Sequence, residues 1–291
     1  MLVVAGSAAA QTRPCPPAGW TIAQLHALKA DKFAVPEPEK RQVLARGLTA
    51  CLGNPDASIR DGIAFEALSV FMRAGALDRD TLTAIKDELL AMIALPDAAG
   101  LQQPFAALVL SEVARTDRVN AWLSDAERDA MVTAAAKFLS TLTDYRAFSN
   151  TEGFRHGVAH GADFALQLAL NPGVTKPQLD RLLAAIAIQV APRDPAVAYW
   201  AGEPDRLARP VLFIAQRKLH SDEDWKAWFA ALMNPAPIQS WDVAFNSENG
   251  IRKRHNVRAF LLSLFAAAST SDDSGLKQLI GPVRDALKLV P

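Results

Sequence analysis

The sequence predicts an all-α protein, an irregular HEAT-like or armadillo-like array of antiparallel helical pairs. Apolar residues recur at three- and four-residue spacing through most of the 291 residues, which is typical of helices. The alternation of β-branched and aromatic residues that marks strands is nearly absent. The segments between the helical stretches are mostly short, so neighbouring helices should run antiparallel.

Capping residues and helix breakers divide the first half. Thr21 and Asp78 are suitable N-caps, and Ser124 followed by Glu127 forms a capping box. The run Gly53-Asn54-Pro55 is a strong helix terminator. We therefore expect helices over residues 22–32, 38–52, 57–73, 79–95, 101–115 and 124–142.

The second half follows the same pattern. Asn171-Pro172-Gly173 and Pro192 end helices there. The expected helices are 151–170, 177–190, 205–219, 222–232, 250–268 and 275–289. Internal sequence similarity is weak, so the array should be irregular, and a compact multi-helix bundle is the alternative. We assign residues 12–291 to a single all-helical domain, with a soft boundary near 143–150.

Composition limits the classes of partner. The chain has 31 Lys and Arg and 31 Asp and Glu, so its formal net charge is zero. A neutral chain has no long-range attraction to nucleic acid or to anionic membranes. We therefore predict no nucleic-acid partner. The hydrophobic fraction of 50% is ample for a large core.

Residues 1–11 resemble the end of a secretory signal peptide. An apolar stretch leads to small residues, Ser7-Ala8-Ala9-Ala10, which suit an A-x-A type cleavage site. The basic residues that usually come first are missing, so we expect translation to start upstream of Met1. This interpretation predicts a periplasmic or secreted protein, and an Ala-rich cytosolic N-terminus is the alternative. The segment is too short to span a bilayer, so we predict no transmembrane anchor.

The two cysteines fit an exported protein. An even number of cysteines in an oxidising compartment favours a disulfide, here between Cys15 and Cys51. The bond would tie a Pro-rich segment to the end of an early helix. The alternative is a pair of free thiols, with Cys51 as a small apolar core residue.

The segment 144–163 carries the most unusual group of polar residues. His156, His160 and Asp163 lie at positions i, i+4 and i+7, which places them within about 60° on one face of a helix. Glu152 and Arg155 add charge beside them. Glycines at positions 153, 157 and 161 form a second stripe, which indicates close approach by another helix or a ligand.

Three interpretations of this group remain open. The two imidazoles and the carboxylate could bind a divalent metal, or they could surround a small ligand or substrate. They could also form a buried polar network that fixes helix packing. The zinc-protease pattern is absent, because Gly157 follows the first histidine where that motif needs Glu. We predict no bound cofactor, with a divalent metal as the alternative.

Two further charged clusters are candidates. Residues 252–256 place Arg252 and His255 near the start of a helix, where positive charge opposes the helix dipole. They form either a solvated basic face or a second side of the same pocket. Glu203, Arg206 and Arg209 are spaced by three residues, and we interpret them as intrahelical ion pairs.

The run Asp144-Tyr145-Arg146, followed by Glu152-Gly153-Phe154-Arg155-His156-Gly157-Val158-Ala159-His160-Gly161-Ala162-Asp163, resembles the uncharacterised family catalogued as domain of unknown function 2785. Members carry a tyrosine–arginine pair, a glycine–aromatic pair and a helix ending in His-x-Ala-Asp. Here Phe154 stands where Trp is expected, and Asn150-Thr151 replaces part of the usual lead-in. The resemblance implies an all-helical, HEAT-like fold, but no activity and no catalytic residues.

These observations favour an exported helical-repeat protein that binds an unidentified protein or small molecule. Its candidate ligand-binding residues are His156, His160, Asp163, Arg155, Glu152, His255 and Arg252. One alternative is a metal-assisted hydrolase that uses His156, His160 and Asp163. Another is a structural envelope protein in which the polar network only supports the fold.

Overall fold

The fold is all-α, as the sequence predicts. The computed structural model describes residues 14–291, so the predicted signal peptide at residues 1–11 lies outside the described residues. The helices of the first half are α1 (Ile22–Ala30), α2 (Pro38–Leu48), α3 (Ala57–Ile59), α4 (Glu66–Arg73), α5 (Arg79–Ala94), α6 (Gln102–Val119) and α7 (Asp125–Thr141). Those of the second half are α8 (Gly157–Ala169), α9 (Lys176–Val190), α10 (Glu203–Gln216), α11 (Asp222–Leu232), α12 (Glu248–Ser269) and α13 (Ser274–Leu289).

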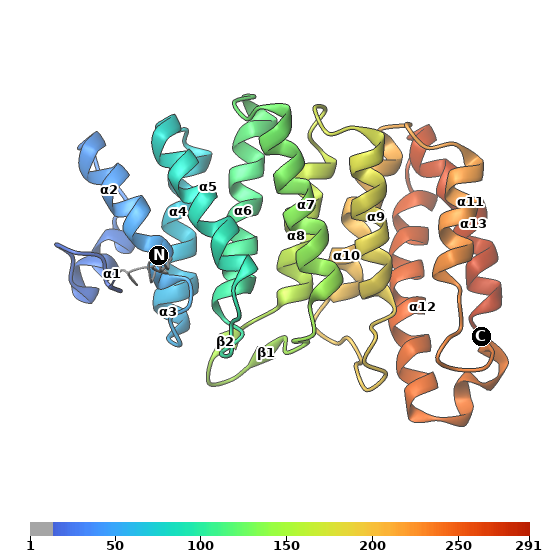
Figure 1. The fold of residues 1–291 in the computed structure, drawn as a ribbon. Helices are drawn as coiled ribbons and strands as arrows, with labels where there is room; N and C mark the ends of the chain where they lie inside the picture. The colour runs from blue at the N-terminus through green and yellow to red at the C-terminus, as the bar shows by residue number, and fades with distance from the viewer. Residues whose placement is uncertain (1–13) are drawn as a thin grey trace, which may run out of the picture.

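The helices stand side by side in two layers that follow the order of the chain (Figure 1). In one layer α4, α6, α8, α10 and α12 pack in series. In the other, α2, α5, α7 and α9 do the same. Chain neighbours such as α5 and α6, or α7 and α8, join the layers. At the C-terminal end α13 packs against α10, α11 and α12. Loops therefore gather at the two long edges of the stack.

Local signals place most helix starts correctly. Thr21 and Ser124 each form the capping box expected from their sequences, and the Asp78 side chain accepts a hydrogen bond from the Thr81 amide. The expected helix over residues 57–73 is interrupted. A π-helical segment, η2 (Arg60–Phe65), separates α3 from α4. Short 3₁₀ segments, η1 (Thr49–Cys51) and η3 (Trp241–Asn246), complete the elements.

The expected helix over residues 151–170 begins later than predicted, at Gly157. The preceding residues form a small antiparallel hairpin of β1 (Phe148–Ser149) and β2 (Gly153–Phe154), with Phe148 opposite Phe154. Gly153 has a φ of 72° and His156 a φ of 54°, so neither backbone is in the right-handed helical region. The hairpin lies at the lower edge of Figure 1, where α7 leads into α8.

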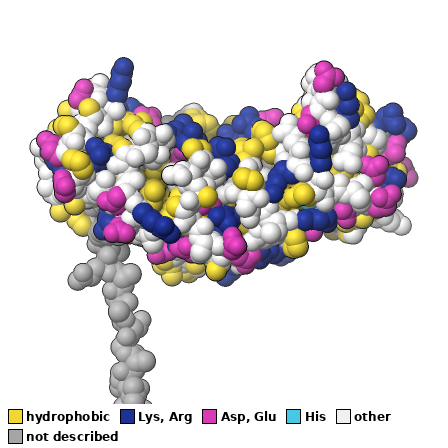
Figure 2. Space-filling model, turned by 90° about the horizontal axis from the view of Figure 1, so that it is seen from above, with side chains coloured by type: hydrophobic (Ala, Val, Ile, Leu, Met, Phe, Trp, Pro, Cys, Tyr) yellow, Lys and Arg dark blue, Asp and Glu magenta, His cyan; other side chains and the backbone are white. Residues whose placement is uncertain are grey.

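The buried apolar residues form one cluster that extends from Leu25 to Val290. Within residues 14–291, no helix combines the length and apolarity needed to cross a membrane. Figure 2 shows the stack from above, and acidic, basic and hydrophobic side chains are mixed over this face. This mixture agrees with the zero net charge of the chain.

The predicted disulfide between Cys15 and Cys51 is present, with a Cα–Cα distance of 5.2 Å. It joins the segment before α1 to η1, across a sequence separation of 36 residues. The Cys51 side chain is also fully buried in the apolar core. The bond therefore fastens the first helices to the body of the stack.

Removing this bond is expected to lower the free energy of unfolding. Replacing both Cys15 and Cys51 with serine should cost about 3–4 kcal/mol on the chain-entropy model for a loop of this length. Urea denaturation of the oxidised wild type and the double variant measures the difference. Reduced wild-type protein is the control, and it should match the double variant within about 1 kcal/mol. Equal stability of the oxidised and reduced wild type would contradict the expectation.

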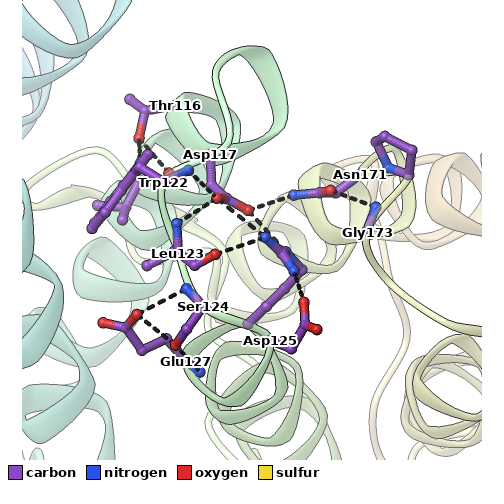
Figure 3. A network of polar contacts seen from close by, with 12 residues as sticks. Thr116, Asp117, Trp122, Leu123, Ser124, Asp125, Glu127, Asn171 and Gly173 are labelled. Carbon is purple, nitrogen blue, oxygen red and sulfur yellow. Dashed lines mark hydrogen bonds and ion pairs between the residues drawn. The ribbon is translucent and has the colours of Figure 1, made fainter.

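A second anchor in the fold is a buried polar network around Asp117 (Figure 3). The Asp117 carboxylate accepts hydrogen bonds from the backbone amides of Trp122 and Leu123, at 2.9 and 2.8 Å. It also accepts bonds from Arg128 Nε at 3.0 Å and Asn171 Nδ2 at 2.7 Å. One carboxylate thus joins α6, the α6–α7 loop, α7 and the loop after α8.

Candidate functional site

The loop between α7 and α8 is held in place by a buried arginine that lies more than ninety residues earlier in the sequence. Arg60 in η2 is fully buried, and its Nη2 donates to the carbonyls of Glu152 and Phe154 at 2.7 and 3.1 Å. Its Nη1 donates to the carbonyl of Asn54 at 3.0 Å. The π-helical turn of η2 thus carries the side chain that fixes the hairpin. Such turns are frequent at functional sites.

A polar cluster lies directly beyond this hairpin. His156 and His160 are 8% and 7% exposed, and their ring centroids are 5.9 Å apart. The His156 ring stacks on Phe154, and the His160 ring meets the edge of Phe105. His156 is the N-cap of α8 rather than part of a longer helix, but its carbonyl accepts a hydrogen bond from the His160 amide at 3.0 Å, so the two histidines lie one turn apart.

Two of the three predicted residues, His156 and Asp163, have charged partners. His156 Nε2 lies 3.5 Å from Glu203 Oε1, which is an ion-pair distance rather than a well-formed hydrogen bond. Asp163 forms a two-point ion pair with Arg206, in which Arg206 Nε lies 2.9 Å from Asp163 Oδ1. Both partners come from α10. Glu203 and Arg206 therefore contact His156 and Asp163 rather than each other. Arg209 does form an intrahelical ion pair, with Asp205.

The carboxylates of the cluster have shifted pKa values. Burial would raise the pKa of Glu203, but His156, the Glu203 amide and the Ala201 amide together hold it below its ordinary value. Burial raises the pKa of Asp163, although Arg206 opposes that shift. The pKa of Glu203 is therefore shifted down and that of Asp163 up from their ordinary values.

His160 is kept neutral by its surroundings. Burial, followed by the positive charges of His156, Arg206 and Arg60, lowers the pKa of His160 to about 3, against a hydrogen bond to the Pro104 carbonyl. Its Nδ1 atom is buried and has no hydrogen-bond partner among the described residues. A buried polar atom without a partner costs about 1–3 kcal/mol.

His156, His160 and Asp163 do not converge as a set of metal ligands. Asp163 is turned to Arg206, and His160 is packed against Phe105. Within residues 14–291, no group of three or more His, Cys, Asp and Glu side chains is arranged to hold a metal ion. The glycine stripe instead serves packing: a Cβ on Gly161 would lie 2.6 Å from Leu139 Cδ2 of α7.

Next to the cluster, at the same edge of the stack, lies a groove of about 270 Å³. We call it the hairpin groove. It is lined by Tyr145, Arg146, Ala147, Phe148, Ser149, Gly153, Arg155 and Trp200. Trp200 is 69% exposed, which is unusual for so large an apolar side chain. The predicted candidate Arg155 therefore faces this groove, in an ion pair with the other candidate, Glu152.

The loop that carries Trp200 is fixed on both sides. Asn256 of α12 accepts a hydrogen bond from the Tyr199 amide at 2.8 Å, and His255 Nε2 lies 2.8 Å from the Tyr199 carbonyl. On the other side, Glu203 Oε2 accepts from the Ala201 amide at 2.9 Å. The exposed indole thus sits on a pinned backbone. Since Glu203 also contacts His156, it joins the Trp200 loop to the hairpin side of the groove.

The arginines of the basic cluster on α12 contact other C-terminal residues rather than His156 or His160. Arg252 pairs with Glu248 one turn earlier, and Arg258 donates to the Val290 carbonyl. Arg254 lies over the ring of Phe245. These three arginines therefore have partners in the C-terminal part of the chain. Among the predicted residues of this cluster, His255 is the one that supports the site, through the Trp200 loop.

The family model described as "Protein of unknown function (DUF2785)" matches residues 89–266, more than half of the chain. The chain belongs to this family. No curated protein and no solved structure matches it significantly. The part of the chain that matches the DUF2785 model contains the hairpin groove, both histidines, Glu203 and Arg206, whereas Arg60 lies outside it.

His160 gives this DUF2785 protein an expected pH dependence. Between pH 6.5 and about 3 the unfolded chain binds a proton on His160 that the folded chain does not, so stability should fall as the pH falls. The slope is at most about 1.4 kcal/mol per pH unit for one proton. His160→Gln should flatten the loss of stability between pH 6 and 4, measured by urea denaturation.

The matched control is His26→Gln, which removes an exposed histidine of α1 without touching the cluster. It should leave the difference between pH 6 and 4 as in the wild type. If His160→Gln and wild-type protein lose the same stability over this interval, another group accounts for the acid sensitivity.

Proposed function

We propose that this protein is an exported binding protein whose stack of helices presents the hairpin groove to a small ligand. The observation that carries the proposal is Trp200, an exposed indole on a loop held by Glu203, His255 and Asn256. An exposed aromatic side chain on a pinned backbone is partly preorganised for contact, so little loop entropy is lost on binding. Two helices, α10 and α12, contribute to this pinning.

The polar cluster has a positioning role in this proposal. His156 and Glu203 link the two loops that border the groove, and Arg60 fixes the hairpin from beneath. Buried charged groups need such specific partners, and in return they specify one arrangement of the loops. The cluster is therefore the base of the site, and the ligand contacts come from the groove residues.

Export is the second part of the proposal. The disulfide between Cys15 and Cys51 supports an oxidising compartment. The signal-like composition of residues 1–11 supports the same destination. N-terminal sequencing of protein from the periplasmic fraction should give a start near Gln11. Intact Met1 on protein from the cytosolic fraction would contradict export.

Native mass spectrometry tests the binding function. Wild-type protein, gently purified from the periplasm, is expected to retain a small-molecule adduct. Trp200→Ala should lose most of it. Phe245→Ala is the matched control, because it removes another exposed aromatic side chain outside the lining of the hairpin groove. Equal adducts on all three proteins, or none on the wild type, would count against a ligand site at Trp200.

A further inference from the structure

We propose that the hairpin groove recognises a neutral saccharide, an inference that rests on the binding function proposed above. Two properties of the groove lead to this class of ligand. It combines an exposed flat aromatic surface with charged side chains that already neutralise one another. The site is small enough for one or two sugar rings rather than a folded partner.

The aromatic surface comes from three residues at the lip of the groove. Trp200 is the most exposed, and Phe148 and Tyr145 also line the groove. Phe148 is held by its ring contact with Phe154, at 4.9 Å between centroids. A pyranose ring has one face made of C–H groups, and it loses water from that face when it stacks on an indole. An exposed indole on a pinned backbone therefore suits a sugar ring.

The charges of the groove disfavour an anion. Arg146 Nε donates to Asp144 Oδ1 at 2.8 Å, and Arg155 forms a two-point pair with Glu152 at 2.6 and 3.0 Å. Both guanidinium groups also donate to the Ala99 carbonyl, at 3.2 and 3.1 Å. An anionic ligand would have to displace a carboxylate that is fixed within two or three residues of its arginine.

Paired arginines and carboxylates are nevertheless good partners for hydroxyl groups. A carboxylate that accepts from one arginine keeps further lone pairs, and a guanidinium has five N–H donors. Among the described residues, the hydrogen bonds of Arg146 use Nε and Nη2, which leaves the Nη1 donors for a ligand. A sugar hydroxyl can accept from the Nη1 donors of Arg146, which lines the groove. A neutral polyhydroxylated ring thus matches both the aromatic surface and the rim.

Saturation-transfer NMR and tryptophan fluorescence test this inference. The probes are cellobiose, maltose and N,N′-diacetylchitobiose, with glucuronate as the anionic comparison and acetyl-tetraglycine amide as the peptide comparison. At least one neutral disaccharide should bind more tightly than glucuronate. Its affinity should fall at least about tenfold in Trp200→Ala, a loss of about 1.4 kcal/mol. Phe245→Ala should bind as the wild type does.

The outcomes separate the two proposals. Binding of glucuronate or of the peptide that depends on Trp200, without binding of a disaccharide, would overturn the saccharide inference and leave the binding function intact. Disaccharide binding that is unchanged in Trp200→Ala would overturn the inference, because the sugar would then bind elsewhere. If the three disaccharides fail to bind while the periplasmic protein retains a Trp200-dependent adduct, the saccharide class is wrong. If the adduct is absent as well, both proposals fail.

Discussion

Arg60→Met is expected to destabilise the protein by about 3–5 kcal/mol, although Met has a similar length and no charge to bury. The Arg60 side chain is fully buried, and its guanidinium donates to the carbonyls of Asn54, Glu152 and Phe154. It also lies 2.7 Å from Asp61 Oδ1. Methionine leaves these carbonyls without a donor and Asp61 without its cation. Each buried group that loses its partner costs about 1–3 kcal/mol.

Urea denaturation and hydrogen exchange measure the two consequences of this change. The free energy of unfolding should fall, and amide exchange in residues 148–156 should become faster than in the rest of the α7–α8 region. Arg79→Met is the matched control. Arg79 is exposed and donates one hydrogen bond to the Trp122 carbonyl, so its loss should cost at most about 1 kcal/mol. Similar effects of the two substitutions would show that Arg60 does not hold the hairpin.

The contacts of Arg60 also show where sequence reasoning stops. Its partners in the hairpin are more than ninety residues away in the chain. In the sequence Arg60 stands in a regular helical pattern, and nothing distinguishes it from a solvated arginine. The π-helical turn that directs it inward is set by packing, because the local apolar spacing of residues 57–73 suits a continuous helix.

Short-range sequence patterns and composition predict several features of the fold correctly. The caps at Thr21 and Ser124, the Cys15–Cys51 bond and the all-α class follow from short-range patterns or from composition. The hairpin was missed because strands of two residues are too short to show alternation. Gly153 is a sequence signal of this turn, because its φ is positive and glycine adopts a positive φ more readily than other residues do.

The sequence singles out a polar segment, but it does not indicate the partners of the residues in that segment. The sequence singled out the segment 144–163, and the histidines, Glu152 and Arg155 do lie together there. However, the spacing of Glu203 and Arg206 predicts that they pair with each other within one helix, since residues three apart in a helix can pair. Their actual partners, His156 and Asp163, are determined by the way α10 packs on α8. Trp200 could be recognised as a groove residue only from its exposure in the fold.

The second large effect is expected at the buried network around Asp117. Asp117→Ala should lower the free energy of unfolding by about 3–5 kcal/mol, because the change leaves the buried guanidinium of Arg128 without its principal carboxylate. The amides of Trp122 and Leu123 and the side chain of Asn171 lose their acceptor as well. The α6–α7 and α8–α9 loops should loosen together, which hydrogen exchange can detect.

Asp125→Ala is the matched control for this prediction. Asp125 contacts the same arginine, through Arg128 Nη1 at 2.8 Å, but its side chain is fully exposed. An exposed ion pair contributes at most about 1 kcal/mol, so this variant should remain close to the wild type. Both variants are compared with wild-type protein by urea denaturation at pH 7. Equal losses in Asp117→Ala and Asp125→Ala would mean that burial of the Asp117–Arg128 pair does not determine its contribution.

The same network has a defined pH dependence. Burial alone would raise the pKa of Asp117, but the hydrogen bonds from Arg128, Leu123, Trp122 and Asn171 outweigh it and hold the pKa below its usual value. The stabilisation by this carboxylate is thus complete above the unfolded pKa of about 3.9, and it is lost as the pH falls through the lower folded value. Asp117→Asn should therefore lose less stability than the wild type between pH 4 and pH 2.5. Parallel losses would place the acid-sensitive carboxylates elsewhere in the stack.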